Sequence, residues 1–84
     1  MPRHKKDTLV ALTVAALDRR SEWYEYNISC VRNYGYLWLV NEWRETDDFY
    51  KCRSLATGTV KNFKAYEITT SKRLMAQPME RNDG

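Results

Sequence analysis

The sequence predicts a single α+β domain: an N-terminal helix packed on a three- or four-stranded antiparallel β-meander, with a short C-terminal helix as an optional last element. The chain has 84 residues, which is enough for one domain. Its composition, 43% hydrophobic and 30% charged, is that of a folded protein. The apolar residues first follow a helical spacing and then an alternating, strand-like spacing.

The first expected element is a helix over residues 7–17. Asp7 is a favourable N-cap residue. The apolar residues after it recur three and four positions apart, with Leu9, Leu12 and Ala16 on one face. About three turns are too short to be stable alone, so this helix should pack on the rest of a domain that spans residues 7–77. Residues 1–6 are expected to form a solvated basic arm, and residues 78–84 a loose tail.

The strands are expected to follow without a domain boundary. Residues 22–32 alternate between Tyr24, Tyr26, Ile28 and Cys30 on one face and Trp23, Glu25, Asn27 and Ser29 on the other, as a half-buried strand does. Further strands are predicted, in chain order, over residues 36–44, 49–55 and 63–70. The last of these is ambiguous, because Val60, Phe63 and Tyr66 also fit a helical stripe. A capping residue at Ser71 and a stop at Pro78 allow a short helix over 72–77.

The turn near Gly35 leaves two registers open for a hairpin between the first two strands. A two-residue Tyr34-Gly35 loop would gather the tyrosines with Leu37, Leu39 and Trp43 and pair Glu25 with Arg44, but it requires positive φ at Tyr34. A three-residue loop that starts at Asn33 suits Gly35 and places Trp38 and Val40 beside the tyrosines instead. Burial favours the first register and turn geometry favours the second.

Either register puts a tryptophan on both faces of the hairpin, and one helix cannot cover both. We therefore expect an aromatic side chain to be partly exposed and to mark a binding surface, with cations from the neighbouring strands. The candidate binding residues are Trp38, Trp23, Tyr36, Tyr34, Arg32, Arg44, Lys51 and Arg53.

The chain lacks the residue patterns of an enzyme or a metalloprotein. Its one histidine, His4, lies in the basic arm, and Asp47 and Asp48 are typical turn formers. Cys30 and Cys52 lack metal-ligand spacing and are expected to be buried thiols of a reduced, cytoplasmic protein. We predict no catalytic residue, no metal site and no cofactor. The chain also has no apolar run of about 18 residues, so no membrane partner is expected.

These observations predict a small non-enzymatic protein-binding module. Tyr, Trp and Arg are enriched at protein interfaces, and a net charge of +3 is modest for a phosphate-dominated interface. By analogy of size, the module would be a bacterial or phage accessory or inhibitor protein. The alternative is a module that binds single-stranded RNA or DNA. Clustering of Arg32, Arg44, Lys51 and Arg53 around an exposed Trp38 would favour nucleic acid, whereas an apolar patch rimmed by mixed charges would favour protein.

Overall fold

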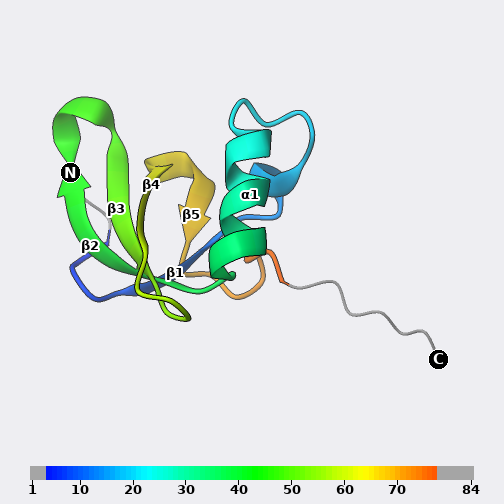
Figure 1. Cartoon of the computed structure of the whole chain (residues 1–84). Coiled ribbons are helices and arrows are strands. Elements are labelled where there is room, and N and C mark those ends of the chain that lie inside the picture. Colours follow the sequence, from blue (N-terminus) through cyan, green and yellow to red (C-terminus); the bar gives the residue numbers. More distant parts are fainter. Residues whose placement is uncertain (1–3, 78–84) are drawn as a thin grey trace.

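The computed structural model describes residues 4–77 and has one α-helix beside a five-stranded antiparallel sheet (Figure 1). The strand order is β4-β3-β2-β1-β5. In chain order the elements are β1 (Leu9–Leu12), α1 (Tyr24–Tyr34), β2 (Trp38–Arg44), β3 (Phe49–Ser54), β4 (Val60–Lys64) and β5 (Ile68–Thr69). The α+β class and the antiparallel sheet are confirmed, but the sheet has five strands instead of three or four.

The predicted helix over residues 7–17 is wrong, because this segment contains β1 and a 3-10 turn at Ala15–Leu17. β1 lies between β2 and β5, and Val10, Ala11 and Leu12 are almost completely buried. A strand buried on both faces reads as a continuous apolar run, which periodicity alone cannot distinguish from a buried helix. Asp7 is not a helix cap: it has a φ of 69°, and its N–H donates to the Val40 carbonyl oxygen at 2.7 Å.

The predicted strand over residues 22–32 is also wrong, because α1 occupies this segment. The helix buries Asn27, Cys30 and Val31, and Tyr34 packs against the core, so the contacts recur at i, i+3, i+4 and i+7. The alternation of tyrosines with polar residues was accidental, and Tyr26 is in fact exposed. Because residues 22–32 are not a strand, both predicted hairpin registers and the predicted Glu25–Arg44 pair are wrong. β2 pairs with β1 and β3 instead.

Gly35 ends α1 and does not form a hairpin turn. It has φ 95° and ψ 179°, and its N–H donates to the Val31 carbonyl oxygen at 3.0 Å. This backbone conformation is essentially restricted to glycine. A Cβ here would lie 3.6 Å from the Ala56 Cβ, an ordinary contact, so steric crowding is not the reason for glycine.

We expect Gly35→Ala to lower the free energy of unfolding by about 1–3 kcal/mol through backbone strain alone. Urea unfolding followed by circular dichroism measures this change. A variant as stable as the parent chain would contradict the assigned conformation of Gly35.

The strands predicted over 36–44 and 49–55 are confirmed as β2 and β3, within two residues at each end. The single strand predicted over 63–70 is instead split into β4, a 3-10 turn at Ala65–Glu67, and β5. The split sends the chain across the domain, so that β4 pairs with β3 and β5 pairs with β1 at the opposite edge. The optional helix over 72–77 does not form. That segment lies along β1 instead, where the Ala76 N–H donates to the Leu12 carbonyl oxygen at 2.8 Å.

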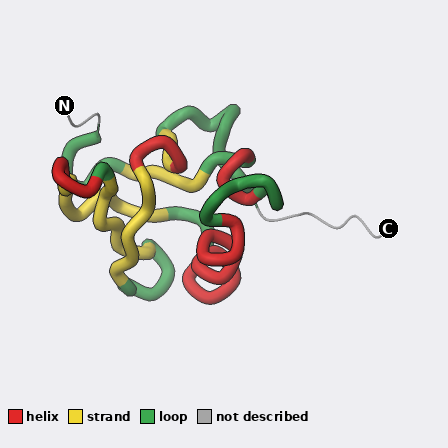
Figure 2. The backbone as a smooth tube through the Cα atoms, turned by 90° about the horizontal axis from the view of Figure 1, so that it is seen from above, coloured by secondary structure: helices red, strands yellow, loops and turns green. Residues whose placement is uncertain are grey.

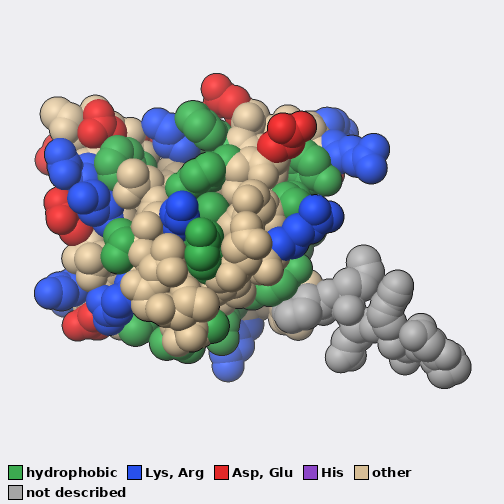
Figure 3. Space-filling view, viewed as in Figure 1, with side chains coloured by type: hydrophobic (Ala, Val, Ile, Leu, Met, Phe, Trp, Pro, Cys, Tyr) green, Lys and Arg blue, Asp and Glu red, His purple; other side chains and the backbone are tan. Residues whose placement is uncertain are grey.

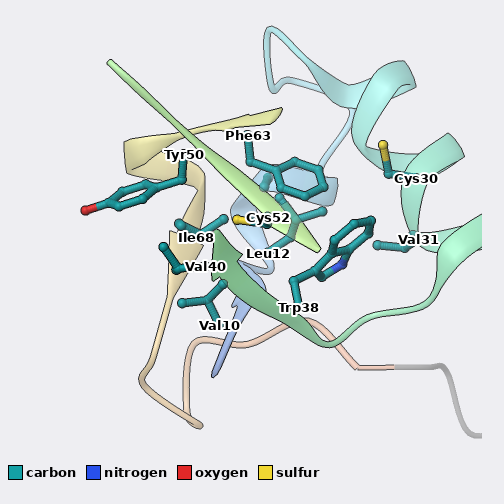
Figure 4. Packing of buried hydrophobic residues seen from close by; sticks show 11 residues of the cluster. Val10, Leu12, Cys30, Val31, Trp38, Val40, Tyr50, Cys52, Phe63 and Ile68 are labelled. Carbon is teal, nitrogen blue, oxygen red and sulfur yellow. The ribbon is translucent and has the colours of Figure 1, made fainter. Parts of the chain in front are cut away.

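Helix α1 stands on one side of the sheet, which we call the inner face (Figures 1 and 2). The core lies between α1 and the inner face and is centred on Trp38. The ring centroids of Trp38 and Phe63 are 4.9 Å apart in an edge-to-face contact. Val31 of α1 extends toward Trp38, and Cys52 of β3 lies among the buried side chains near Phe63 and Leu12 (Figure 4). One core therefore serves all the elements.

The structure tests the predicted N-terminal arm but not the predicted C-terminal tail. His4 was expected in the solvated arm but instead packs on the domain. Its ring centroid is 5.2 Å from that of Tyr50, and its backbone N–H donates to the Tyr50 hydroxyl at 3.1 Å. Lys5 and Lys6 are exposed, as expected. The predicted tail, 78–84, lies outside the described residues.

Candidate binding surfaces

Trp38, the central residue of the expected binding surface, is only 1% exposed. It lies on the inner face of β2, and its indole N–H donates to the Gly35 carbonyl oxygen at 3.1 Å. No partner can reach this side chain in the folded protein. Trp38 is therefore a core residue, and its assignment to the binding surface is corrected.

The other aromatic candidates do not form one platform. Trp23 is 39% exposed at the start of α1. Tyr34 is half-buried at the other end of the helix, where the Lys61 ammonium lies 5.2 Å from its ring centroid. Tyr36 is half-buried just beyond it, before β2. Trp43, the third tryptophan, is half-buried and packs on Tyr50.

The basic candidates do not form a free positive patch. Arg44, Lys51 and Arg53 share the outer face of β2 and β3, and Glu42 lies among them. Basic and acidic side chains are interspersed over the left side of the molecule, where β2 and β3 lie (Figure 3). Arg44 pairs with Glu42 at 3.6 Å, and Arg53 pairs with Asp7 at 3.3 Å. Arg53 also donates to the Asn41 side-chain oxygen at 2.8 Å. Arg32 is exposed on the last turn of α1, away from this face.

An apolar groove of about 820 Å³ lies where the C-terminal end of α1 meets the sheet. Exposed apolar side chains from three segments line it: Leu9 is 43% exposed, Leu37 41% and Leu55 52%. A backbone hydrogen bond joins two of these segments, because the Leu55 N–H donates to the Leu37 carbonyl oxygen at 3.0 Å. Leu37 lies in the connection from α1 to β2, and Leu55 directly follows β3. The remaining lining residues are Gly35, Tyr36, Ala56, Lys72, Met75, Ala76 and Gln77. We call this surface the leucine groove.

Sequence reasoning missed the leucine groove. Leu9 was assigned to a helix, Leu37 to a hairpin strand whose buried face was left open, and Leu55 to the end of a strand. The alternation of side chains along residues 37–40 could have indicated part of this groove. If Trp38 and Val40 point toward the core, Leu37 and Leu39 must point the other way. Only the fold, however, brings Leu9 and Leu55 beside Leu37.

A second pocket, of about 620 Å³, lies at the N-terminal end of α1. Trp23 and Tyr26 form two of its walls, with ring centroids 6.3 Å apart and ring planes at 74°. The remaining lining includes Phe49, Phe63, Asp47, Lys64 and Glu67. We call this surface the aromatic pocket.

Glu67, in the wall of the aromatic pocket, is only 3% exposed. The Ser21 hydroxyl donates to its Oε2 at 2.9 Å. Its Oε1 is buried and has no hydrogen-bond partner among the described residues. A buried carboxylate oxygen without a donor is unusual, and such an atom calls for a specific explanation.

The two cysteines are buried and free, which confirms their assignment as buried thiols. Burial raises the pKa of the Cys52 thiol to about 12, and burial also raises the pKa of Cys30. A thiol with a raised pKa is a poor nucleophile near neutral pH. Within residues 4–77 the structure brings together no group of three or more His, Cys, Asp or Glu side chains that would hold a metal ion.

The chain matches no protein-family model, no curated protein and no solved structure. Among the described residues, α1 is too short and too polar to cross a membrane.

Proposed function

We propose that this protein is a small non-enzymatic protein-binding module and that the leucine groove is its contact surface. The supporting observation is the convergence of Leu9, Leu37 and Leu55, three exposed leucines from separate segments, in one groove. Contiguous exposed apolar surface on a small domain is typical of an interaction site.

The chemistry of the groove favours a protein partner with apolar side chains. Lys72 is the one charged side chain in its lining, and Tyr36 and Gln77 supply polar groups. Interfaces between proteins commonly combine an apolar centre with a polar rim. Complete burial of a leucine side chain stabilises by about 1.5–3 kcal/mol, so further burial of three half-exposed leucines would drive association.

Direct nucleic-acid binding is the competing function, and the arrangement of cations favours it less. Arg44 and Arg53 each have an acidic partner, and the aromatic side chain that they were expected to surround is buried. Phosphate binding depends on cations that can replace counterions, which already paired arginines do less readily.

The proposal includes the role of a bacterial or phage accessory or inhibitor protein. A domain of 84 residues that acts by binding can occupy a surface of a larger partner and thereby modulate it. This part of the proposal rests on size and on the absence of catalytic patterns in the sequence.

Leu55→Asp is expected to weaken a groove ligand at least about thirtyfold, because hot-spot residues contribute about 2 kcal/mol or more. Ligands can be selected from a displayed random-peptide library against the folded protein, and their affinities measured by calorimetry. Val60→Asp is the matched control, because Val60 is 45% exposed and lies outside the groove. Both variants should keep their stability within about 1 kcal/mol.

Two outcomes would contradict the proposed function. One is a set of selected peptides that bind the parent chain and Leu55→Asp equally well. The other is tryptophan fluorescence that changes saturably with single-stranded nucleic acid and loses the change steeply with salt, since that behaviour marks phosphate-driven binding.

A further inference from the structure

We propose that the aromatic pocket is a binding site for an organic ammonium ion, such as an alkylamine or the side chain of a lysine. This site goes beyond the proposed protein-binding function. It lies at the N-terminal end of α1, whereas the leucine groove adjoins Gly35 at the C-terminal end.

The walls of the pocket suit a cation. The rings of Trp23 and Tyr26 line the same open pocket with their planes at 74°, which places two aromatic side chains beside one volume. The face of an aromatic ring attracts an ammonium group, and tryptophan is the strongest of the three aromatic side chains in this respect. Phe49 from β3 and Phe63 from β4 add two more aromatic side chains to the lining.

The pocket is held in shape before any ligand enters. The Tyr26 hydroxyl donates to the Asn62 carbonyl oxygen at 2.8 Å and accepts from the Asn62 N–H at 3.2 Å. This pair of bonds ties α1 to the edge strand β4. A site already in its binding geometry loses less entropy when the ligand binds.

Glu67 makes the pocket selective for positive charge. Its carboxylate lies in the pocket wall, is almost completely buried, and has one oxygen without a donor. In an environment of low dielectric constant, a cation in the pocket is attracted to the charge of this carboxylate more strongly than it would be in water. Asp47 adds a second acidic residue to the lining.

Lys64 shows within the structure that this site accommodates an ammonium group. Its Nζ lies 6.0 Å from the Trp23 ring centroid and donates to the Asp47 carbonyl oxygen at 3.1 Å. A ligand cation would share the pocket with this internal cation. Removal of the Lys64 charge should therefore strengthen ligand binding, whereas removal of the Glu67 charge should weaken it.

The first experiment is a titration of the full chain with n-butylammonium, followed by amide and indole chemical shifts in NMR spectra. Ionic strength is held constant with sodium chloride, and 1-butanol serves as the uncharged ligand of similar shape. We expect saturable shifts at Trp23, residues 46–49 and residues 62–67, with 1-butanol at least about tenfold weaker. Equal binding of 1-butanol, or shifts scattered over the whole domain, would overturn the proposal.

The second experiment tests the sign of the charge effects. Glu67→Gln keeps an acceptor for Ser21 and should weaken the binding of n-butylammonium about tenfold or more, because it removes the charge that attracts the cation through a medium of low dielectric constant. Lys64→Met should strengthen it severalfold. Glu42→Gln and Lys51→Met are the matched controls, because they make the same charge changes on the outer face of the sheet. They should leave the affinity within about twofold, since exposed charges are screened.

If Glu67→Gln fails to fold, Lys64→Met still decides the matter: unchanged or weaker binding in that variant would overturn the proposal. A short peptide with one lysine between glycines distinguishes the sources of the ammonium group. Tighter binding of the peptide than of n-butylammonium identifies a partner's side chain, and equal or weaker binding identifies a free amine.

Discussion

Trp38→Ala is expected to destabilise the domain by about 3–5 kcal/mol, the usual cost of deleting a large aromatic side chain from a core. Trp38 is 1% exposed and packs on Phe63 and Tyr34 from different parts of the chain. Its removal also deletes the hydrogen bond to Gly35. Small domains are stable by about 5–15 kcal/mol, so the variant should retain little stability. Urea unfolding followed by far-ultraviolet circular dichroism measures the loss.

Trp23→Ala is the matched control for Trp38→Ala. Trp23 is 39% exposed and lies at the helix end, so its removal should cost less than about 2 kcal/mol. If Trp38 were the exposed binding residue expected from the sequence, Trp38→Ala would weaken binding and leave the fold intact. If Trp38→Ala proves as stable as Trp23→Ala, the placement of Trp38 in the core is wrong.

The second large effect is a loss of stability above pH 9 that originates at Cys52. Burial raises the pKa of its thiol from 9.0 to about 12 in the folded chain. Between these values the unfolded chain loses the proton and the folded chain keeps it, so unfolding becomes more favourable as the pH rises. The contribution of the buried neutral thiol is therefore fully present below pH 9 and is lost between pH 9 and about 12. At about 1.4 kcal/mol per pH unit, the loss by pH 11 is about 2–3 kcal/mol.

Cys52→Ala isolates this effect, because every other titrating group is shared with the parent chain. Tyr26, whose pKa is raised to about 12 chiefly by burial, contributes to both profiles above pH 10. The free energy of unfolding should fall less steeply above pH 9 in Cys52→Ala than in the parent chain. Parallel profiles between pH 7 and 11 would show that Cys52 titrates normally and is accessible to water.

The two proposals assign different tasks to the two ends of α1. The leucine groove at the C-terminal end is proposed to bind a protein partner, and the aromatic pocket at the N-terminal end is proposed to bind an ammonium ion. The variants that test them touch different residues, so one proposal can fail and the other still hold.

Local sequence patterns were sufficient to predict an element where one of its faces is buried and the other is exposed. β2 and β3 have this arrangement, and their alternation predicted them within two residues at each end. The pattern failed for β1, since nearly all of that strand is buried, and for α1, whose tyrosines alternate by chance. In both segments the apolar spacing fits either period, and packing against distant strands decides between them.

The candidate site depended even more on packing. Tyr36 and Trp23 were named from the sequence and do line the two surfaces, whereas Trp38 was named and is buried. Leu9, Leu55 and Glu67 were not named. An exposed leucine or a buried glutamate is defined by its neighbours, and those neighbours are distant in the sequence.

The sequence by itself determined the α+β class, the antiparallel sheet, two of its strands and the burial of both thiols, because residue type and local periodicity control these features. Only the tertiary structure decided which segment became the helix and which edge each late strand joined. It also decided which side chains remained exposed. The physical reason is that burial is a property of the whole fold: the same apolar residue stabilises a core or lines a groove according to what packs against it.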